Sequence, residues 1–94
     1  MRLTPQEAEI IKHAILKYAP DAQVLLFGSR VDDAARGGDI DVLALTKHND
    51  LETKLKIKVE LFKHLEDQKI DLILAKDKDA SPFVSMAYEQ AEAL

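Results

Sequence analysis

The spacing of apolar residues near the start of the chain predicts a helix from about Thr4 to Tyr18. Thr4, Pro5 and Glu7 match a capping box, in which the threonine and glutamate side chains accept hydrogen bonds from free amides and proline occupies a position that needs no donor. Pro20 ends the pattern. The apolar positions of this helix are Ala8, Ile11, Ile15 and Tyr18.

Three short apolar runs predict strands at Gln23–Phe27, Asp39–Leu45 and Ile70–Ala75. The first run is apolar on both faces, as expected for a buried strand, and it ends at Gly28. Val31–Gly38 is polar and ends in glycine, so we expect a short helical turn and a loop there. The loop is short enough to bring the first two strands together.

A second helix is predicted from about Asp50 to Glu66, with an unusually wide apolar arc. Its simplest interpretation is core packing, although an arc of this width can also extend into a subunit or partner interface. Lys54 and Lys58 interrupt the arc, and their stems can cover apolar surface while the charges stay in water. The arc consists of Leu51, Leu55, Ile57, Val59, Leu61, Phe62 and Leu65.

Ser81 and Pro82 repeat a capping signature and predict a last helix that carries Phe83, Ala87 and Ala91. The predicted fold is therefore a single mixed α/β (α+β) domain over residues 1–94, in the order helix, strand, strand, helix, strand, helix. The helices would pack on a small mixed sheet of three strands. The 94 residues suffice for one modest core and not for a separate substrate-binding domain.

Composition narrows the classes of function. The net charge of −4 and the absence of a basic block argue against direct binding to nucleic-acid backbones. The chain has no cysteine, which excludes disulfides and thiolate metal sites and fits a cytoplasmic protein. We find neither an apolar signal core nor a run long enough to span a membrane.

Acidic residues at the starts of two predicted strands carry the candidate chemistry. Asp39 and Asp41 would project to one face of their strand, and two neighbouring carboxylates repel each other unless a cation such as Mg²⁺ compensates. Gly28 and Ser29 end the preceding strand, where a glycine lets a phosphate approach and a hydroxyl can bond it. With Asp71 early on the third strand, the arrangement suggests a two-metal phosphoryl- or nucleotidyl-transfer site with Asp71 as general base.

Simpler interpretations stay open for each of these residues. Gly28 and Ser29 could form a hairpin turn beside two surface acids, and Asp71 could be a surface acid on an edge strand. Arg30 and Arg36 fit solvated loop charges as well as phosphate contacts. The histidines show no paired metal spacing and are expected at the surface.

Two stretches carry a family resemblance. Leu26-Phe27-Gly28-Ser29-Arg30, followed by Gly37-Gly38-Asp39-Ile40-Asp41-Val42-Leu43, resembles the signature of the DNA polymerase beta-like nucleotidyltransferases. Ile70-Asp71-Leu72-Ile73 matches the third acid of that family. Together with the small size and the order of elements, the chain is similar to the minimal nucleotidyltransferases (MNT), the antitoxins of HEPN/MNT toxin–antitoxin pairs.

The resemblance implies transfer of AMP from ATP to a partner protein, with ATP as substrate and two Mg²⁺ ions as the expected cofactors. Asp39, Asp41 and Asp71 would be the metal-binding and catalytic residues, and Gly28 and Ser29 would hold the triphosphate. The implied partner is a HEPN ribonuclease toxin, which some family members silence by placing AMP on a tyrosine. Two alternatives stay open: an antitoxin that neutralises its partner by binding alone, and the catalytic half of a two-chain small-molecule nucleotidyltransferase.

Overall fold

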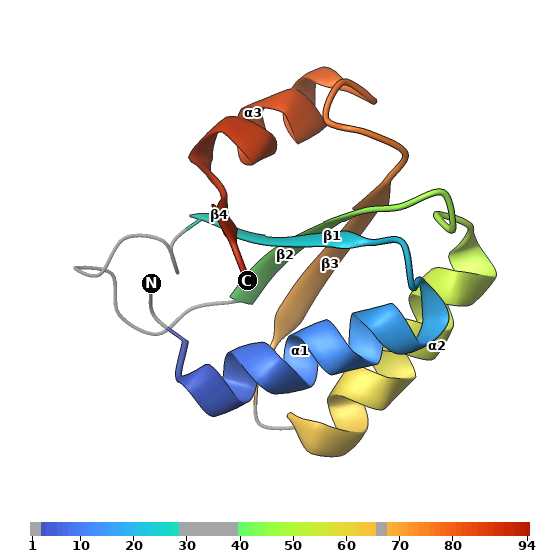
Figure 1. The fold of residues 1–94 in the computed structure, drawn as a ribbon, viewed down its shortest axis with the longest axis vertical. Helices are drawn as coiled ribbons and strands as arrows, with labels where there is room; N and C mark the ends of the chain where they lie inside the picture. The colour runs from blue at the N-terminus through green and yellow to red at the C-terminus, as the bar shows by residue number, and fades with distance from the viewer. Residues whose placement is uncertain (1–2, 29–39, 66–67) are drawn as a thin grey trace.

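The computed structural model describes residues 3–28, 40–65 and 68–94, and the chain forms alternating helices and strands over these ranges (Figure 1). The predicted helices and strands are all present, with small differences at their ends. The elements are α1 (Pro5–Tyr18), β1 (Gln23–Phe27), β2 (Ile40–Leu45), α2 (Leu51–His64), β3 (Ile70–Ala75), α3 (Pro82–Gln90) and β4 (Glu92–Ala93).

The strands form one mixed sheet in the order β3-β2-β1-β4. β1 is antiparallel to both β2 and β4, whereas β2 and β3 are parallel. The prediction of three strands is wrong, because the chain after α3 returns to the sheet as the short strand β4. Ala91, which we expected inside the last helix, is instead its C-cap. β4 pairs through its backbone and both of its side chains are exposed, so no alternation of apolar residues marks it in the sequence.

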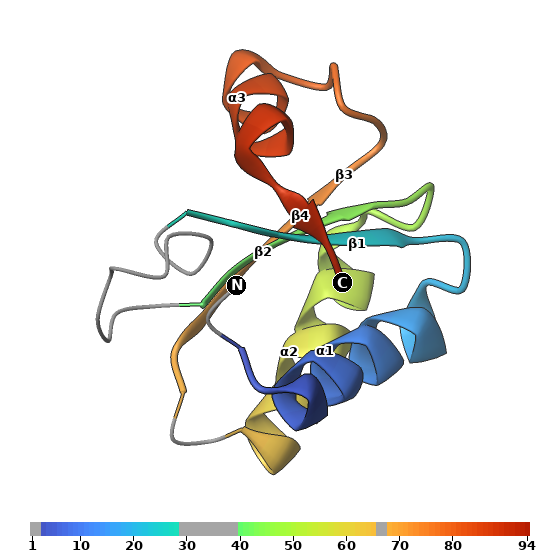
Figure 2. The same cartoon turned by 60° about the vertical axis from the view of Figure 1, so that its left-hand side comes forward.

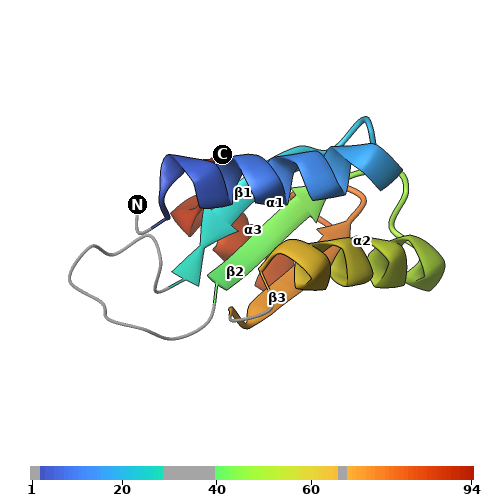
Figure 3. The ribbon, with the colours of Figure 1, turned by 90° about the horizontal axis from the view of Figure 1, so that it is seen from below.

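The sheet has helices on both faces. Figures 2 and 3 show α1 and α2 side by side on one face and α3 on the other. Because side chains alternate along a strand, the sheet separates two apolar clusters. The cluster under α1 and α2 is built on Ile11, Ala14, Ile15, Val24, Leu26, Ile40, Val42, Ala44, Ile57, Leu61 and Leu72. The cluster under α3 is built on Leu25, Phe27, Leu43, Ala75, Val84 and Ala87.

The helix starts follow the predicted capping signals. The amide of Glu7 donates to the Thr4 hydroxyl at 3.1 Å, and the Thr4 amide donates to the Glu7 carboxylate at 3.0 Å, which completes the capping box. The amide of Val84 donates to the Ser81 hydroxyl at 3.1 Å at the start of α3. These contacts satisfy amides that no carbonyl of the helix can reach.

The core-packing interpretation of the α2 arc is wrong for most of its residues. Ile57 and Leu61 are buried, with exposed fractions of 0% and 3%. The other side of the arc points away from the core because α2 contacts the sheet and α1 along a single face. The exposed large residues on that side are Leu51 (69%), Leu55 (52%), Val59 (58%) and Phe62 (65%).

A hydrogen-bonded clip joins the loop before β1 to the loop after β2. The Thr46 hydroxyl donates to Asp21 Oδ1 at 2.6 Å, and the Lys47 amide donates to Asp21 Oδ2 at 2.8 Å. The His48 amide donates to the Thr46 hydroxyl oxygen at 2.9 Å. These donors, the Thr46 hydroxyl first among them, hold the pKa of Asp21 below its ordinary value.

The substitution Thr46→Val is expected to lower Tm by roughly 4 to 8 °C, because Thr46 is buried and valine keeps its shape without its hydrogen bonds. The pKa of Asp21 should rise toward its ordinary value in this variant. A group whose pKa is lowered by folding stabilises the protein above its ordinary pKa, and this contribution disappears as the pH falls through the lowered value. The difference in Tm should therefore shrink in acid, which thermal unfolding at several pH values would show. A constant difference would contradict the pairing with Asp21.

Candidate active site at the acidic edge of the sheet

The end of β1 and the beginnings of β2 and β3 meet at one edge of the sheet. β1 runs antiparallel to β2, so Phe27 at its end pairs with Asp41 near the start of β2. β3 runs parallel to β2, so Asp41 is also the register partner of Asp71. Segments that are far apart in the sequence are thus brought together where the motifs predict the site.

Asp41 and Asp71 lie on the same face of the sheet. Partners in register on adjacent strands project to the same side, and neighbouring strands are about 4.8 Å apart. Ile40 and Val42 pack into the cluster under α1 and α2, which assigns Asp41 to the opposite face, the one that α3 covers. Asp41 is partly buried and Asp71 is exposed. Two carboxylates therefore share one solvent-accessible side of this edge.

Gly28 packs directly against the carboxylate of Asp41. Its φ is +76°, a conformation that favours glycine. A Cβ at this position would overlap Asp41 Oδ2 and lie 3.1 Å from Asp41 Cγ. The glycine of the Gly-Ser motif is therefore required both by the turn and by the space that the acid occupies.

Ser29 and Asp39, also predicted as site residues, lie outside the described residues. The phosphate contact of Ser29 and the metal-binding role of Asp39 therefore stay predictions. The structure brings together the other three predicted residues, Gly28, Asp41 and Asp71.

The described carboxylates fit a hard divalent cation. Mg²⁺ takes oxygen ligands and is usually held by one or two carboxylates together with substrate phosphates. Asp41 and Asp71 supply such oxygens from neighbouring, in-register positions, and Gly28 leaves room next to one of them. Within residues 3–28, 40–65 and 68–94, no group of three or more His, Cys, Asp or Glu side chains is placed to hold a metal.

Two features beside the acids were not predicted from the sequence. Phe83, in the first turn of α3, meets Phe27 edge-on with the ring centroids 6.1 Å apart, and it is 49% exposed. Phe27 is the register partner of Asp41, so this aromatic pair, which we call the Phe83 wall, lies at the same edge of the sheet as the acids. A pocket of about 280 Å³, which we call the Asp71 pocket, lies between the end of α2 and the start of β3. It is lined by Lys58, Leu61, Phe62, Leu65, Gln68, Lys69, Ile70 and Asp71. No local sequence pattern marks either feature, because both depend on which faces α2 and α3 present.

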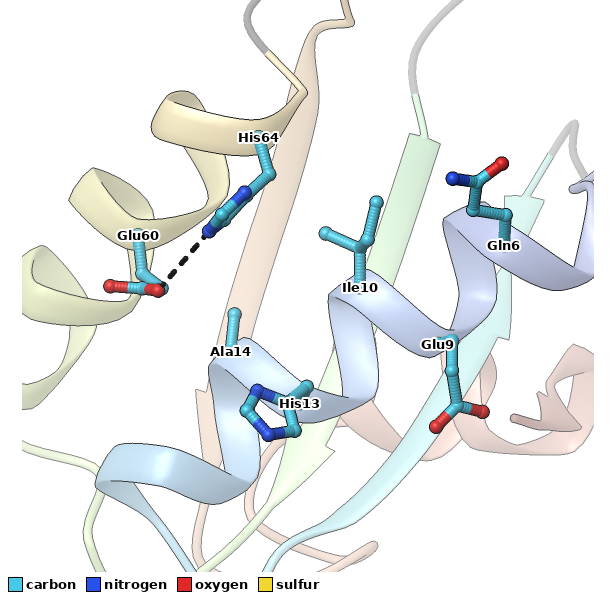
Figure 4. Close-up of a pocket in the computed structure, with 7 residues that line it drawn as sticks. All are labelled: Gln6, Glu9, Ile10, His13, Ala14, Glu60 and His64. Carbon is cyan, nitrogen blue, oxygen red and sulfur yellow. Dashed lines mark ion pairs between the residues drawn. The ribbon is translucent and has the colours of Figure 1, made fainter.

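A separate groove of about 320 Å³ lies between α1 and α2, the two helices on the other face of the sheet (Figure 4). Ile10 and Ala14 contribute apolar surface to it, and Glu9, Glu60 and His64 are among its polar residues. Burial raises the pKa of Glu60, but its ion pairs outweigh that effect and the pKa lies below its ordinary value. These pairs join Glu60 to Lys17 at 3.3 Å and to His64 at 3.4 Å. The groove's carboxylates would repel a phosphate, so the acidic edge is the better candidate for nucleotide chemistry.

Comparison with known families agrees with this geometry. The family model described as "Polymerase beta, Nucleotidyltransferase" matches residues 9–94. The chain belongs to this family. The match confirms the family that the Gly-Ser and Asp-Ile-Asp motifs predicted. Members of the polymerase beta nucleotidyltransferase family use nucleotides and metal ions, which is the chemistry that paired carboxylates at this edge suit.

The fold is similar to that of a chain in the solved complex of a tri-AMPylated Shewanella oneidensis HEPN toxin with an MNT antitoxin. The TM-score is 0.67 at 22% sequence identity, and the similarity covers 94% of this chain and 68% of that chain. A comparison with curated proteins finds no significant match. Among the helices that the structure describes, none has the length and hydropathy needed to cross a bilayer.

Proposed function

We propose that this nucleotidyltransferase-family protein transfers AMP from ATP to a hydroxyl group of a partner protein. The observation that carries the proposal is the parallel register of Asp41 with Asp71, which sets two carboxylates side by side on one accessible face. Gly28, packed against Asp41, adds a turn whose backbone a phosphate can approach. This combination fits nucleotidyl transfer better than a hairpin with unrelated surface acids.

In the proposed reaction, the oxygen of the acceptor hydroxyl attacks the α-phosphorus of ATP. The bond between the α-phosphorus and the oxygen that bridges to the β-phosphate breaks, and pyrophosphate leaves with the electron pair. Asp71 is exposed at the start of β3 and accepts the hydroxyl proton. Gly28 and Ser29 hold the triphosphate in line with the attacking oxygen.

Asp41 and Asp71, together with Asp39, would hold the Mg²⁺ ions. When bound, these ions neutralise charge on the phosphates and favour the ionised acceptor. The protein's own contribution is to fix the carboxylates on adjacent strands, so that little reorganisation is needed when the nucleotide binds.

The partner that we propose is a HEPN-type toxin, which the protein would neutralise as an antitoxin. The similar fold in the complex of an AMPylated HEPN toxin with an MNT antitoxin supports this partner. The exposed apolar side of α2 supports a second candidate, neutralisation by binding alone, because such a surface can occlude a partner without chemistry.

The test is to incubate the protein with Mg²⁺, lysate of the source cells and ATP labelled at the α- or the γ-phosphate. We expect only the α-label to become fixed to a protein band, and we expect excess chelator to reduce labelling to background. The Asp39→Asn/Asp41→Asn variant should label nothing, because the site loses two carboxylates while the core stays intact.

Other results of this labelling experiment would support a different function. Transfer of the γ-label would indicate a kinase and would reject nucleotidyl transfer. If neither label is transferred while a HEPN-type protein co-purifies with the wild type and the variant alike, neutralisation by binding becomes the better explanation. Labelling of a small molecule in the presence of a helical partner would favour the two-chain small-molecule enzyme.

A further inference from the structure

The side of α2 that faces away from the core carries a continuous apolar stripe. Its residues are spaced by three or four positions, so they follow one another along a single face of the helix. The stripe consists of Leu51, Leu55, Val59 and Phe62, and we call it the α2 stripe. All four residues are more than half exposed. An apolar surface of this kind, rimmed by charges, is typical of a protein-binding face.

Lysines lie on both flanks of the α2 stripe. Lys58 lies toward β3, where it lines the Asp71 pocket, and Lys54 is one turn earlier on the same side. Lys56 and Lys63 lie toward α1, where they line a hollow of about 290 Å³ with Leu55 and Val59. Two acidic residues, Glu52 and Glu60, also line this hollow. Glu52 pairs with Lys56 at 3.2 Å and Glu60 pairs with Lys63 at 4.0 Å, so the unbalanced positive charge lies on the side of Lys54 and Lys58.

The charges that flank the α2 stripe favour one of two possible binding partners. A second copy docked stripe to stripe would bring together two surfaces with the same excess of positive charge, and like charges across an interface are unfavourable. An acidic amphipathic surface would cover the apolar residues and pair with the lysines. α2 carries four lysines against two glutamates, a local excess of positive charge in a chain whose net charge is −4.

The stripe leads to the candidate active site. Phe62, at its C-terminal end, lines the Asp71 pocket together with Asp71 itself. A protein seated on α2 would therefore reach the start of β3, the edge strand that carries Asp71, whose carboxylate projects to the other face of the sheet.

We infer that the α2 stripe is the docking surface for the acceptor protein, and that the acceptor covers it with an acidic, amphipathic helical face. The inference rests on the proposed function for the identity of the acceptor. The argument for docking itself rests on the exposed apolar residues and the charges beside them, and it does not require that the protein be catalytically active. An acceptor docked along α2 would extend past the Asp71 pocket and around the edge strand β3 to bring its hydroxyl to the acidic edge.

The first test uses the variant Leu55→Gln/Val59→Gln with the protein that α-labelled ATP identifies as acceptor. Both residues are exposed, so the fold should survive, and circular dichroism would check this. We expect the KM for the acceptor to rise about tenfold or more while kcat stays near the wild-type value, because the variant loses docking contacts and keeps the acids. The matched control is Leu16→Gln/Met86→Gln, which changes two exposed apolar residues on α1 and α3 and should behave as the wild type.

The second test needs neither the acceptor nor catalysis. Two helical peptides of about 18 residues would carry the same leucine stripe, flanked in one by glutamates and in the other by lysines. We expect the glutamate peptide to bind, to bind more weakly as salt is raised, and to lose affinity in the variant Lys56→Glu/Lys63→Glu. Equal binding of the two peptides, or binding by neither, would overturn the charge argument.

Failures of the two proposals can be told apart. Normal acceptor kinetics in Leu55→Gln/Val59→Gln would reject docking at the α2 stripe and leave AMP transfer standing. Selective peptide binding without any AMP transfer would reject the reaction and leave the docking surface standing. A wild-type dimer that becomes a monomer in Leu55→Gln/Val59→Gln, measured by light scattering, would assign the stripe to a second copy and overturn the inference.

Discussion

Asp71→Asn is expected to lower the rate of AMP transfer by about 10²- to 10⁴-fold, the usual contribution of a positioned general base. Asparagine has nearly the shape of aspartate, but it cannot take the proton of the acceptor hydroxyl. Asp71 is exposed near the start of an edge strand, so its replacement should leave the core unchanged. Single-turnover transfer from α-labelled ATP to the acceptor measures the effect.

The matched control for this experiment is Asp77→Asn. Asp77 is an exposed aspartate just beyond the other end of β3, and its Oδ1 accepts a hydrogen bond from the Asp79 amide that asparagine can also accept. We expect wild-type rates for it. A full rate in Asp71→Asn would assign the proton to another group and remove Asp71 from the proposed chemistry.

Gly28→Ala is expected to reduce AMP transfer by about 10²-fold and to lower the free energy of unfolding by about 1 to 3 kcal/mol. The φ of +76° is strained for alanine, and the added methyl group would occupy the space of the Asp41 carboxylate. The Asp41 carboxylate must then move away from its position beside Asp71. We therefore expect the substitution to disturb the geometry of the site and to lower the stability of the protein. Denaturant unfolding and the α-label assay measure the two effects separately.

A double-mutant cycle separates backbone strain from the clash. In an Asp41→Ala background the carboxylate is gone, so Gly28→Ala should cost less free energy of unfolding than it does in the wild type. The remaining cost reports the strained φ alone. If Gly28→Ala lowers the free energy of unfolding equally in both backgrounds, the clash with the Asp41 carboxylate contributes nothing to its effect.

Much of the fold was predictable because its signals are local. The Thr4 and Ser81 caps and the apolar runs of β1 to β3 place these elements almost to the residue. β4 was missed because a two-residue strand is fixed by backbone pairing with Leu25 and Leu26 and carries no pattern of its own. The sequence could not decide which part of the α2 arc is buried, because that choice depends on where α1 and β3 lie.

The meeting of three of the predicted site residues follows from the sequence. Residue type and spacing predicted that Gly28, Asp41 and Asp71 meet, and the sheet register places Asp41 beside Asp71. Their roles in catalysis and metal binding stay predictions, as do those of Ser29 and Asp39. The Asp71 pocket and the Phe83 wall arise from contacts between elements distant in sequence, so no local pattern could reveal them.

The parallel register of β2 and β3 makes the site sensitive to chain length. Asp41 and Asp71 belong to strands that are connected through α2, and side chains on a strand alternate between its faces. A shift of β3 by one position would turn Asp71 toward α1 and α2, and it would also turn Leu72 out of the core. An insertion or deletion of a single residue that moved this register would thus separate the two carboxylates, although every residue of the motifs would still be present.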